Sequence, residues 1–524
     1  AHLFDAWVAA RDRLARLTVL GEDEKSPQRY RARLEKARAD KDAAERALAD
    51  RSWEFRNERS RDAAGLPEVR AALPPGSSLV AFVKYPRISR AKAGAAEAAS
   101  APPVDAYAAF VLRQGARAPD VVPLGAAKAI DAAVASMRDS MVRTSATLGG
   151  PGGTPVTSYR RLAVTLGDLA WRPLERHLAG TKTAFVVPDG SLQLVSFAAL
   201  PCEADAWLLE KGPVFHYLSA ERDLVPSNDV KGAGLLVAGS PDFDSLPLAV
   251  DQSAAPRLRG PEPTAPAALV HRGPPPSCRS FASLRFPALP ASLGEVEEIA
   301  GLWRDASASG NGKGPRASKA GPPLLLSGAA ASERAVKENA PGRSVVHLTT
   351  HGFFLGECMA RASSSGEKTA GDLASAVYAE NPLLLSGLAF AGANRRAEAP
   401  AGGDDGILTA EEVAALDLTG VSWAVLSACE SGLGEARAGE GLFGLRRAFQ
   451  VAGARTLITS LWPVEDEASR RWMKALYEGR LARGLDTARA VREASLAVLR
   501  ERRAAGLSDH PFFWAGFLAS GDWR

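Results

Sequence analysis

The stretch Val421 to Gly434, with the sequence VSWAVLSACESGLG, places the strongest constraint on the fold. An apolar run typical of a buried β-strand stops there at Ala428-Cys429 and passes directly into a glycine-containing turn. A second apolar run, Ser344 to Thr350, ends in the same way at His351-Gly352. In open α/β sheets, ligands bind beyond the carboxyl ends of the strands. If the two strands are neighbours, the sequence predicts a thiol and an imidazole that face each other at one edge of a sheet.

Predicted strands and helices alternate along most of the chain, which is typical of an α/β sheet. Residues 5–64 are rich in Arg, Glu, Asp and Ala, carry a thin apolar stripe and predict two helices broken at 21–27. Next, residues 78–85, 106–114 and 120–125 predict a β-meander. Further strands are predicted at 184–188, 214–219, 234–238, 323–326, 344–350, 383–390 and 455–462, and helices at 126–141, 159–178, 293–303, 332–340, 441–452, 465–483 and 486–503.

Composition divides the chain into four expected parts. Residues 1–72 are a helical region, 76–240 an α/β part with a β-rich leading segment, and 293–524 a second α/β part. Between the last two, 241–292 is rich in Pro, Ser, Ala and Arg, which predicts an exposed, flexible insertion. We therefore expect an α/β fold whose mostly parallel sheet is flanked by helices, with an N-terminal helical hairpin.

Charge and cysteine usage limit the classes of partner and compartment. The net charge of +4, from 64 basic and 60 acidic residues, gives no argument for a nucleic-acid or membrane partner. The 4 cysteines are scattered without a C-x-x-C motif, which argues against a disulfide framework and favours a reducing cytoplasm. No run reaches about 18 apolar residues, and no signal-peptide pattern is present. Because the chain starts at Ala1 rather than Met, the presence of an upstream segment stays open.

Several motifs, in order along the chain, resemble those of one family. The motifs are VPDGSLQLVSFAALP (187–201), HLTTHG (347–352), GILTAEEVAALDL (406–418), LSACESGLG (426–434), GEGLFGLRRAFQVAGA (439–454), SLWPVEDEAS (460–469) and HPFFWAGF (510–517). They are similar to the CHAT family of caspase-like cysteine peptidases, in the same broad clan as caspases, separases and gingipains. The resemblance covers roughly residues 76–524 and implies a caspase-like fold. It also implies a Cys–His dyad, with Cys429 as nucleophile and His351 as the catalytic imidazole.

Elementary chemistry agrees with that dyad. A free thiol has a pKa near 8.5 and is a weak nucleophile at neutral pH, and a neighbouring imidazole shifts it toward thiolate. His351 would then act as base and as proton donor to the leaving amine, while the backbone N–H groups of Gly352 and Cys429 would be the oxyanion donors. No cofactor is needed for this reaction.

The same residues admit competing interpretations. A lone Cys at a strand end is more often an inert core thiol, and pairing with His351 is what favours catalysis for Cys429. His347 could suggest an H-x-x-x-H metal site, but there is no adjacent Glu and no third ligand, so no metal is expected and His347 is interpreted as a core residue. Ser196 and Ser460 lack a G-x-S-x-G turn, which argues against a serine hydrolase.

The substrate pocket is less well specified. Metacaspase relatives carry an acidic residue two positions before the nucleophile, where this chain has Ser427, so a basic cleavage preference does not carry over. Trp462 is the last residue of the predicted strand 455–462 and is a candidate pocket wall beside an extended peptide. The candidate pocket acids are Asp405, Glu430, Glu440 and Asp466, although a solvated loop residue or a helix N-terminal charge is the favoured interpretation of each.

The resulting prediction is an intracellular cysteine endopeptidase that cuts a specific partner protein. Some family members act on gasdermin-like pore-formers, so the resemblance extends to a bacterial gasdermin-like substrate and to prokaryotic regulation, defence or programmed cell death. An activating protein partner is a further expectation. The alternative is a non-catalytic caspase-like scaffold, which loss of His351 or Cys429 would have indicated; both are present.

Overall fold

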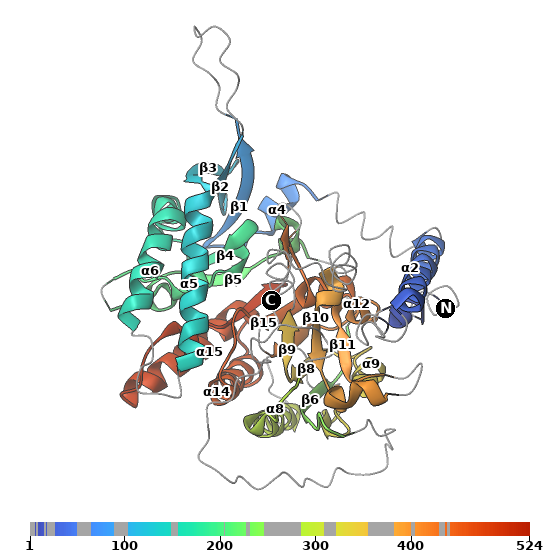
Figure 1. Cartoon of the computed structure of the whole chain (residues 1–524). Coiled ribbons are helices and arrows are strands. Elements are labelled where there is room, and N and C mark those ends of the chain that lie inside the picture. The colour runs from blue at the N-terminus through green and yellow to red at the C-terminus, as the bar shows by residue number, and fades with distance from the viewer. Residues whose placement is uncertain are drawn as a thin grey trace, which may run out of the picture. The chain divides into compact units, whose positions relative to one another are not determined.

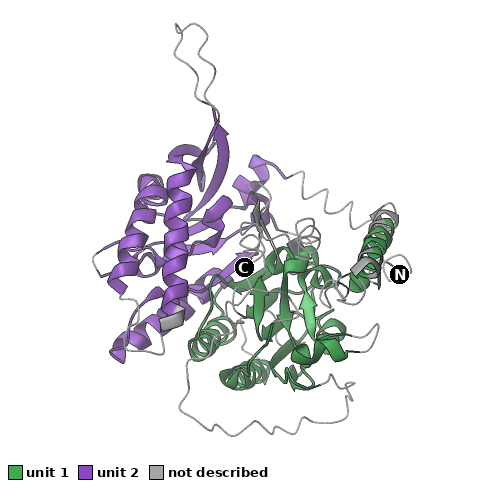
Figure 2. Cartoon of the chain, viewed as in Figure 1, with its two compact units in different colours: residues 1–63, 228–435, 443–485 green, residues 64–227, 436–442, 486–524 purple. Residues whose placement is uncertain are grey.

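The computed structural model describes residues 6, 9–14, 17, 27–49, 64–88, 103–147, 156–203, 205–226, 231–245, 284–308, 321–354, 382–399, 404–428, 435–437 and 441–524 (Figure 1). Its contacts divide the chain into two compact units (Figure 2). Unit 1 is Ala1–Ala63, Asn228–Glu435 and Phe443–Leu485, and unit 2 is Ala64–Ser227, Ala436–Leu442 and Asp486–Arg524. The four-part division expected from composition is a different description of the chain and stays a prediction.

Unit 1 is built on five parallel strands. Their order is β15 (Thr456–Ser460), β12 (Trp423–Ser427), β8 (Val345–Thr349), β6 (Leu235–Pro241) and β7 (Leu324–Gly328). A separate antiparallel sheet has the order β11 (Ile407–Thr409), β10 (Ser386–Ala389) and β9 (Gly352–Phe354). Because β9 begins three residues after β8 ends, the chain turns from the main sheet into the small sheet at His351.

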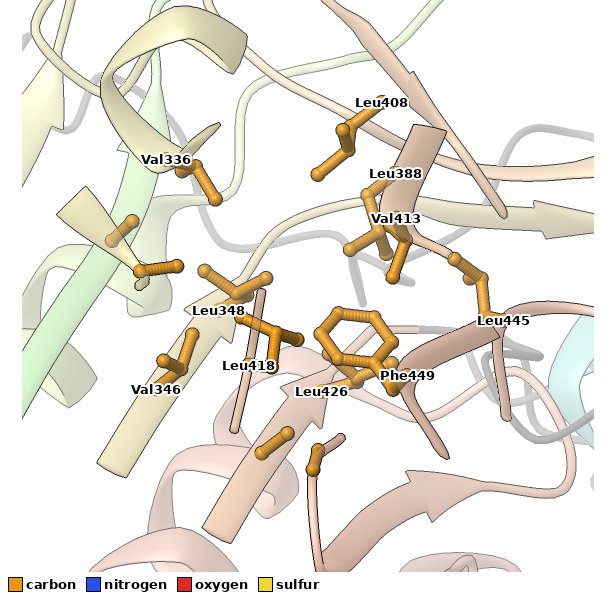
Figure 3. Close-up of a cluster of buried hydrophobic side chains, with 14 of the residues drawn as sticks. Val336, Val346, Leu348, Leu388, Leu408, Val413, Leu418, Leu426, Leu445 and Phe449 are labelled. Atoms are coloured by element: carbon orange, nitrogen blue, oxygen red, sulfur yellow. The ribbon is translucent and has the colours of Figure 1, made fainter. Parts of the chain in front are cut away.

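Helices cover both faces of this parallel sheet. On one face, α9 (Glu333–Asn339), α12 (Ala410–Val413) and α13 (Leu445–Val451) enclose a core that includes Leu348 and Leu426 (Figure 3). On the other face lie α8 (Pro290–Ala308), which packs on β6 and β8, and α14 (Asp466–Tyr477), which packs on α8. Side chains alternate along a strand, so β8 supplies apolar residues to the first face and polar residues to the second.

Unit 2 combines a meander with parallel strands. The order is β3 (Asp120–Ala126), β2 (Val104–Arg113), β1 (Ser77–Arg87), β4 (Thr183–Val187), β5 (Val214–Tyr217) and β16 (Phe517–Gly521). The first three strands are antiparallel, as the sequence predicts, and β1, β4, β5 and β16 are parallel. Its helices are α4 (Leu66–Ala72), α5 (Ala127–Thr147), α6 (Val156–Ala170), α7 (Leu208–Lys211) and α15 (Thr487–Ala504).

Shorter elements complete the chain. Helix α2 (Pro27–Ala49) and the helical residues 9–14 belong to the expected N-terminal hairpin. Short helical turns are η1 (Arg172–His177), η2 (Gly190–Leu194), η3 (Phe197–Ala199), η4 (Glu221–Leu224), η7 (Pro382–Leu385), η8 (Ala393–Glu398), the π-turn η9 (Glu478–Ala482) and η10 (Pro511–Phe513), and β13 (Glu435–Arg437) pairs with β14 (Gly441–Phe443). Among the described helices none combines the length and apolar character needed to cross a bilayer.

The mixed α/β fold with a mostly parallel sheet and flanking helices is confirmed. Two predicted elements differ in detail. The strand predicted over 383–390 starts as the turn η7, because Pro382 fixes a backbone angle suited to a first helical turn. The helix predicted over 441–452 starts only at Leu445, after β14, because Gly444 holds an extended conformation before it.

Candidate active site

The strands that precede the two predicted catalytic residues are neighbours, as expected. β8 and β12 run parallel, and their register pairs Thr349 with Ser427. His351 follows β8 by two residues, Ala428 follows β12 by one, and both are fully buried. Cys429 lies outside the described residues. The described part of the site is therefore the imidazole and the two strand ends.

The His351 ring is oriented by a backbone carbonyl. Its Nε2 lies 2.7 Å from the carbonyl oxygen of Pro287, and a carbonyl oxygen can only accept a hydrogen bond. Nε2 therefore carries the proton, and in a neutral ring the lone pair is on Nδ1. The ring also packs against Phe243 and Phe286, with centroid separations of 5.2 and 5.7 Å. An imidazole held in this way can take up a proton at Nδ1 without rotation of the ring.

The Pro287 carbonyl belongs to a segment that hydrogen bonds hold in place. Phe286 N donates to Asn394 Oδ1 over 2.9 Å, and Asn394 Nδ2 donates to Phe286 O over 3.0 Å. Arg396 donates to the Leu284 carbonyl over 3.0 Å. Leu284 and Phe286 are buried in a cluster with Phe243, although they fall within the stretch expected to be an exposed insertion. Leu284, Phe286 and Leu289 thus belong to the core rather than to an exposed loop. The remainder of the expected insertion, residues 246–283, lies outside the described residues.

Both strand ends are held by hydroxyl groups. Ser460 Oγ donates to the Ala428 carbonyl over 2.6 Å, which fixes the last described residue before Cys429. Thr350 donates to the Ala389 carbonyl, and Ala389 N donates to the His351 carbonyl over 2.9 Å. From the sequence, Ser460 is recognisable only as a rejected candidate nucleophile, and its part in holding the strand end is not predicted.

The residues predicted to bind the substrate or its oxyanion are mostly buried and contact other parts of the fold. Gly352 is buried and pairs with Leu388 at the start of β9. Trp462 is buried two residues beyond β15. One Asp405 carboxylate oxygen accepts from Ile407 N over 2.9 Å, and one Asp466 carboxylate oxygen accepts from Ala291 N over 2.7 Å. Two carboxylates proposed for the pocket thus serve the fold as well.

Two further pocket acids, Glu430 and Glu440, lie outside the described residues. The assignment of these acids, of Trp462 and of the Gly352 oxyanion donor stays a prediction.

His347 is a core residue, as predicted. It is fully buried, and its Nε2 lies 2.9 Å from Glu295 Oε1 and 2.8 Å from Thr349 Oγ1. Its Nδ1 lies 3.2 Å from the Tyr477 hydroxyl. The sequence signal for this network is Glu295, which shares the buried stripe of α8 with Val296, Ile299 and Trp303.

Comparison with known proteins gives the family. The CHAT domain matches residues 160–522, which is more than half of the chain. The chain belongs to the CHAT domain family. The sequence resemblance described above is therefore confirmed at the level of the family.

The curated relatives of this CHAT protein match it over a small part of its length. Tetratricopeptide repeat protein 28 of Homo sapiens is 36% identical over 115 residues, covering 22% of this chain and 4% of the relative, and the Mus musculus protein gives the same values. The chain thus spans only a small fraction of those proteins. Gingipain R, an Arg-specific cysteine proteinase, is similar with 10% identity, TM-score 0.36 and 74% of each chain covered. The separase–securin complex of Saccharomyces cerevisiae is similar with 9% identity, TM-score 0.33 and 74% and 22% covered.

Proposed function

We propose that this CHAT protein is a cysteine endopeptidase, with Cys429 as nucleophile and His351 as general acid and base. The observation that carries the proposal is the 2.7 Å hydrogen bond from His351 Nε2 to Pro287, because it leaves Nδ1 as the basic nitrogen. That imidazole follows the strand beside β12, and Cys429 is bonded directly to Ala428 at the end of β12. Membership of the CHAT domain family supports the same reaction class.

The reaction follows from ordinary thiol chemistry. Nδ1 of His351 takes the thiol proton, and the thiolate of Cys429 attacks the peptide carbonyl carbon. The backbone N–H groups of Gly352 and Cys429 donate to the oxyanion. The imidazolium then gives its proton to the leaving amine as the C–N bond breaks, which leaves a thioester. Water, deprotonated by the same imidazole, hydrolyses the thioester and restores the thiol.

The proposed substrate is a specific partner protein, with a bacterial gasdermin-like pore-former as the first candidate. The setting would be prokaryotic regulation, defence or programmed cell death in the cytoplasm, with an activating protein partner. In this proposal Trp462 and the acids Asp405, Glu430, Glu440 and Asp466 line the substrate pocket. A charged pocket would select its ligand by pairing with the opposite charge.

The test compares wild type, Cys429→Ala, His351→Ala and Cys202→Ala on a diverse peptide library by mass spectrometry. Cys202 is an exposed free thiol and is the matched control. Loss of cleavage in the first two variants, with cleavage kept in Cys202→Ala, is the expected result. Cleavage that persists in Cys429→Ala would exclude the proposal.

A second readout does not depend on knowing the substrate. Alkylation of Cys429 by iodoacetamide, followed by mass spectrometry against pH, reports its thiolate fraction. We expect reaction at pH values well below about 8.5, and a shift to higher pH in His351→Ala. A wild-type protein that neither cleaves any peptide nor reacts at low pH would instead be the non-catalytic scaffold.

A further inference from the structure

A buried polar network lies on β8, the strand that leads to the proposed catalytic imidazole. His347 and Thr349 occupy alternate positions of β8 and so share one face of the strand, and His351 follows two residues after Thr349. Glu295 of α8 and Tyr477 of α14 meet this face. The side chains of His347 and Glu295 are both 0% exposed. Placing a carboxylate there is costly unless it is paired and hydrogen-bonded, so the network requires a physical explanation.

The hydrogen bonds of the network fix one another. Thr349 donates its hydroxyl proton to Glu295 Oε1 over 2.7 Å, so towards His347 it can only accept. His347 Nε2 therefore carries a proton that points at both Glu295 and Thr349. Burial, together with the Glu295 carboxylate, raises the pKa of Tyr477 well above its usual value, so its hydroxyl stays protonated beside His347 Nδ1.

Helix α8 is thereby attached to β8 at one point, and a second attachment lies at the catalytic imidazole. The carbonyl that orients His351 comes from Pro287, three residues before α8 begins at Pro290. Glu295 is five residues inside the same helix. The N-terminal turn of α8 is also tied to α14, because Ala291 N donates to Asp466 over 2.7 Å. A shift of α8 along β8 would break the Glu295 and Pro287 contacts together.

We infer that Glu295 is a positioning residue for His351, acting through His347 and Thr349 to hold α8 where the Pro287 carbonyl meets His351 Nε2. This inference rests on the proposed peptidase function. When the carbonyl is displaced, the imidazolium loses its acceptor and Nδ1 is no longer fixed as the basic nitrogen. The thiolate–imidazolium pair then becomes less stable, and the thiol of Cys429 requires a higher pH to ionise.

The variants Glu295→Gln and Thr349→Val test this arrangement while keeping side-chain shape. Matched controls are Thr349→Ser, which keeps the hydroxyl, and Glu298→Gln, which removes a half-buried carboxylate of the same helix that pairs with Arg470 of α14 (2.9 Å) and takes no part in the network. We expect Glu295→Gln and Thr349→Val to lower kcat by about tenfold to a hundredfold with little change in KM. The pH midpoint of Cys429 alkylation should rise in both, and the controls should match wild type.

A purely structural role predicts a different result. Folded Glu295→Gln or Thr349→Val protein, verified by near-UV circular dichroism, with unchanged kcat and unchanged alkylation midpoint would overturn the inference. If Glu295→Gln fails to fold, Thr349→Val decides alone. Failure of the peptidase proposal is a separate result, because cleavage and Cys429 alkylation are first measured on the wild-type protein. A wild-type protein whose Cys429 shows no low-pH alkylation removes both ideas before any network variant is made.

Discussion

Replacing Asp12 with Asn is expected to strengthen the packing of the N-terminal helical residues at neutral pH. Asp12 lies within residues 9–14, which are joined to α12 by the buried Arg11–Glu411 ion pair (3.0 Å). Burial raises the pKa of Asp12 from its ordinary 3.8 to about 6, with Lys337 opposing that rise. The folded state therefore binds the Asp12 proton more tightly than the unfolded state does.

The sign and size of the effect follow from proton linkage. The stability that the neutral carboxyl contributes is fully present below pH 3.8, falls as pH rises, and is lost above about 6. Each pKa unit corresponds to about 1.4 kcal/mol, so the ionised carboxylate costs about 3 kcal/mol at pH 7. Asn resembles the neutral carboxyl in size and polarity, so Asp12→Asn avoids that cost at every pH.

Native-state hydrogen exchange of residues 9–14 and of α2 measures the opening free energy of this segment directly. The Asp12→Asn variant should exceed wild type by about 3 kcal/mol at pH 7 and match it near pH 4. Asp40→Asn is the control, because its pair with Arg13 at 3.4 Å is exposed and contributes under about 1 kcal/mol. An equal difference at both pH values, or a less stable variant at pH 7, would refute the reasoning.

Three further predictions concern stability, and urea unfolding checks each. Lys337→Met should destabilise unit 1 by about 3–5 kcal/mol, because the ammonium group binds the carboxylates of Glu333, Asp404 and Glu412 at 2.5 to 3.1 Å and all three would lose that ion pair. Gly190→Ala should lower the free energy of unfolding because Gly190 has a φ of +54° and an added Cβ would clash with the Tyr107 hydroxyl. The loss should be about 1–3 kcal/mol larger than for Gly115→Ala, because Gly115 has a φ of +84° but its Cβ would meet nothing within 4 Å. Burial lowers the pKa of His510 from 6.5 to about 4, so unit 2 should lose up to about 3 kcal/mol as pH falls from 6.5 through 4, and His510→Asn should lessen that loss.

The parts of the fold that the sequence predicts well are those with strong local patterns. The apolar runs before His351 and Cys429 identify β8 and β12, because a strand buried on both faces reads as a continuous apolar segment. The helix after Asp486 is equally clear, since that aspartate caps it by accepting from Arg489 N over 2.8 Å. Adjacency of β8 and β12 is the condition that the Cys–His dyad implied by the family resemblance requires, and the parallel pairing of the two strands meets it.

The parts that the sequence does not predict depend on contacts between distant residues. Glu295 and His347 are 52 positions apart, and Pro287 and His351 are 64 apart. No periodicity in either segment encodes such a pairing. Ser460 offers a hydroxyl after a strand, but its partner is a backbone carbonyl on the neighbouring strand, and a carbonyl has no residue-specific signature.

The segment that orients the imidazole shows why proline content alone misleads. The stretch from Leu284 to Pro290 belongs to the segment 241–292, whose content of Pro, Ser, Ala and Arg predicts an exposed insertion. A residue before proline is restricted to extended conformations, so Phe286 and Leu289 are held extended by the prolines that follow them. Leu284, Phe286 and Leu289 are buried, and the prolines reduce the conformational entropy lost on fixing them. A stiff extended segment of this kind suits a carbonyl that must bind one ring nitrogen, and here proline marks a rigid part of the candidate site.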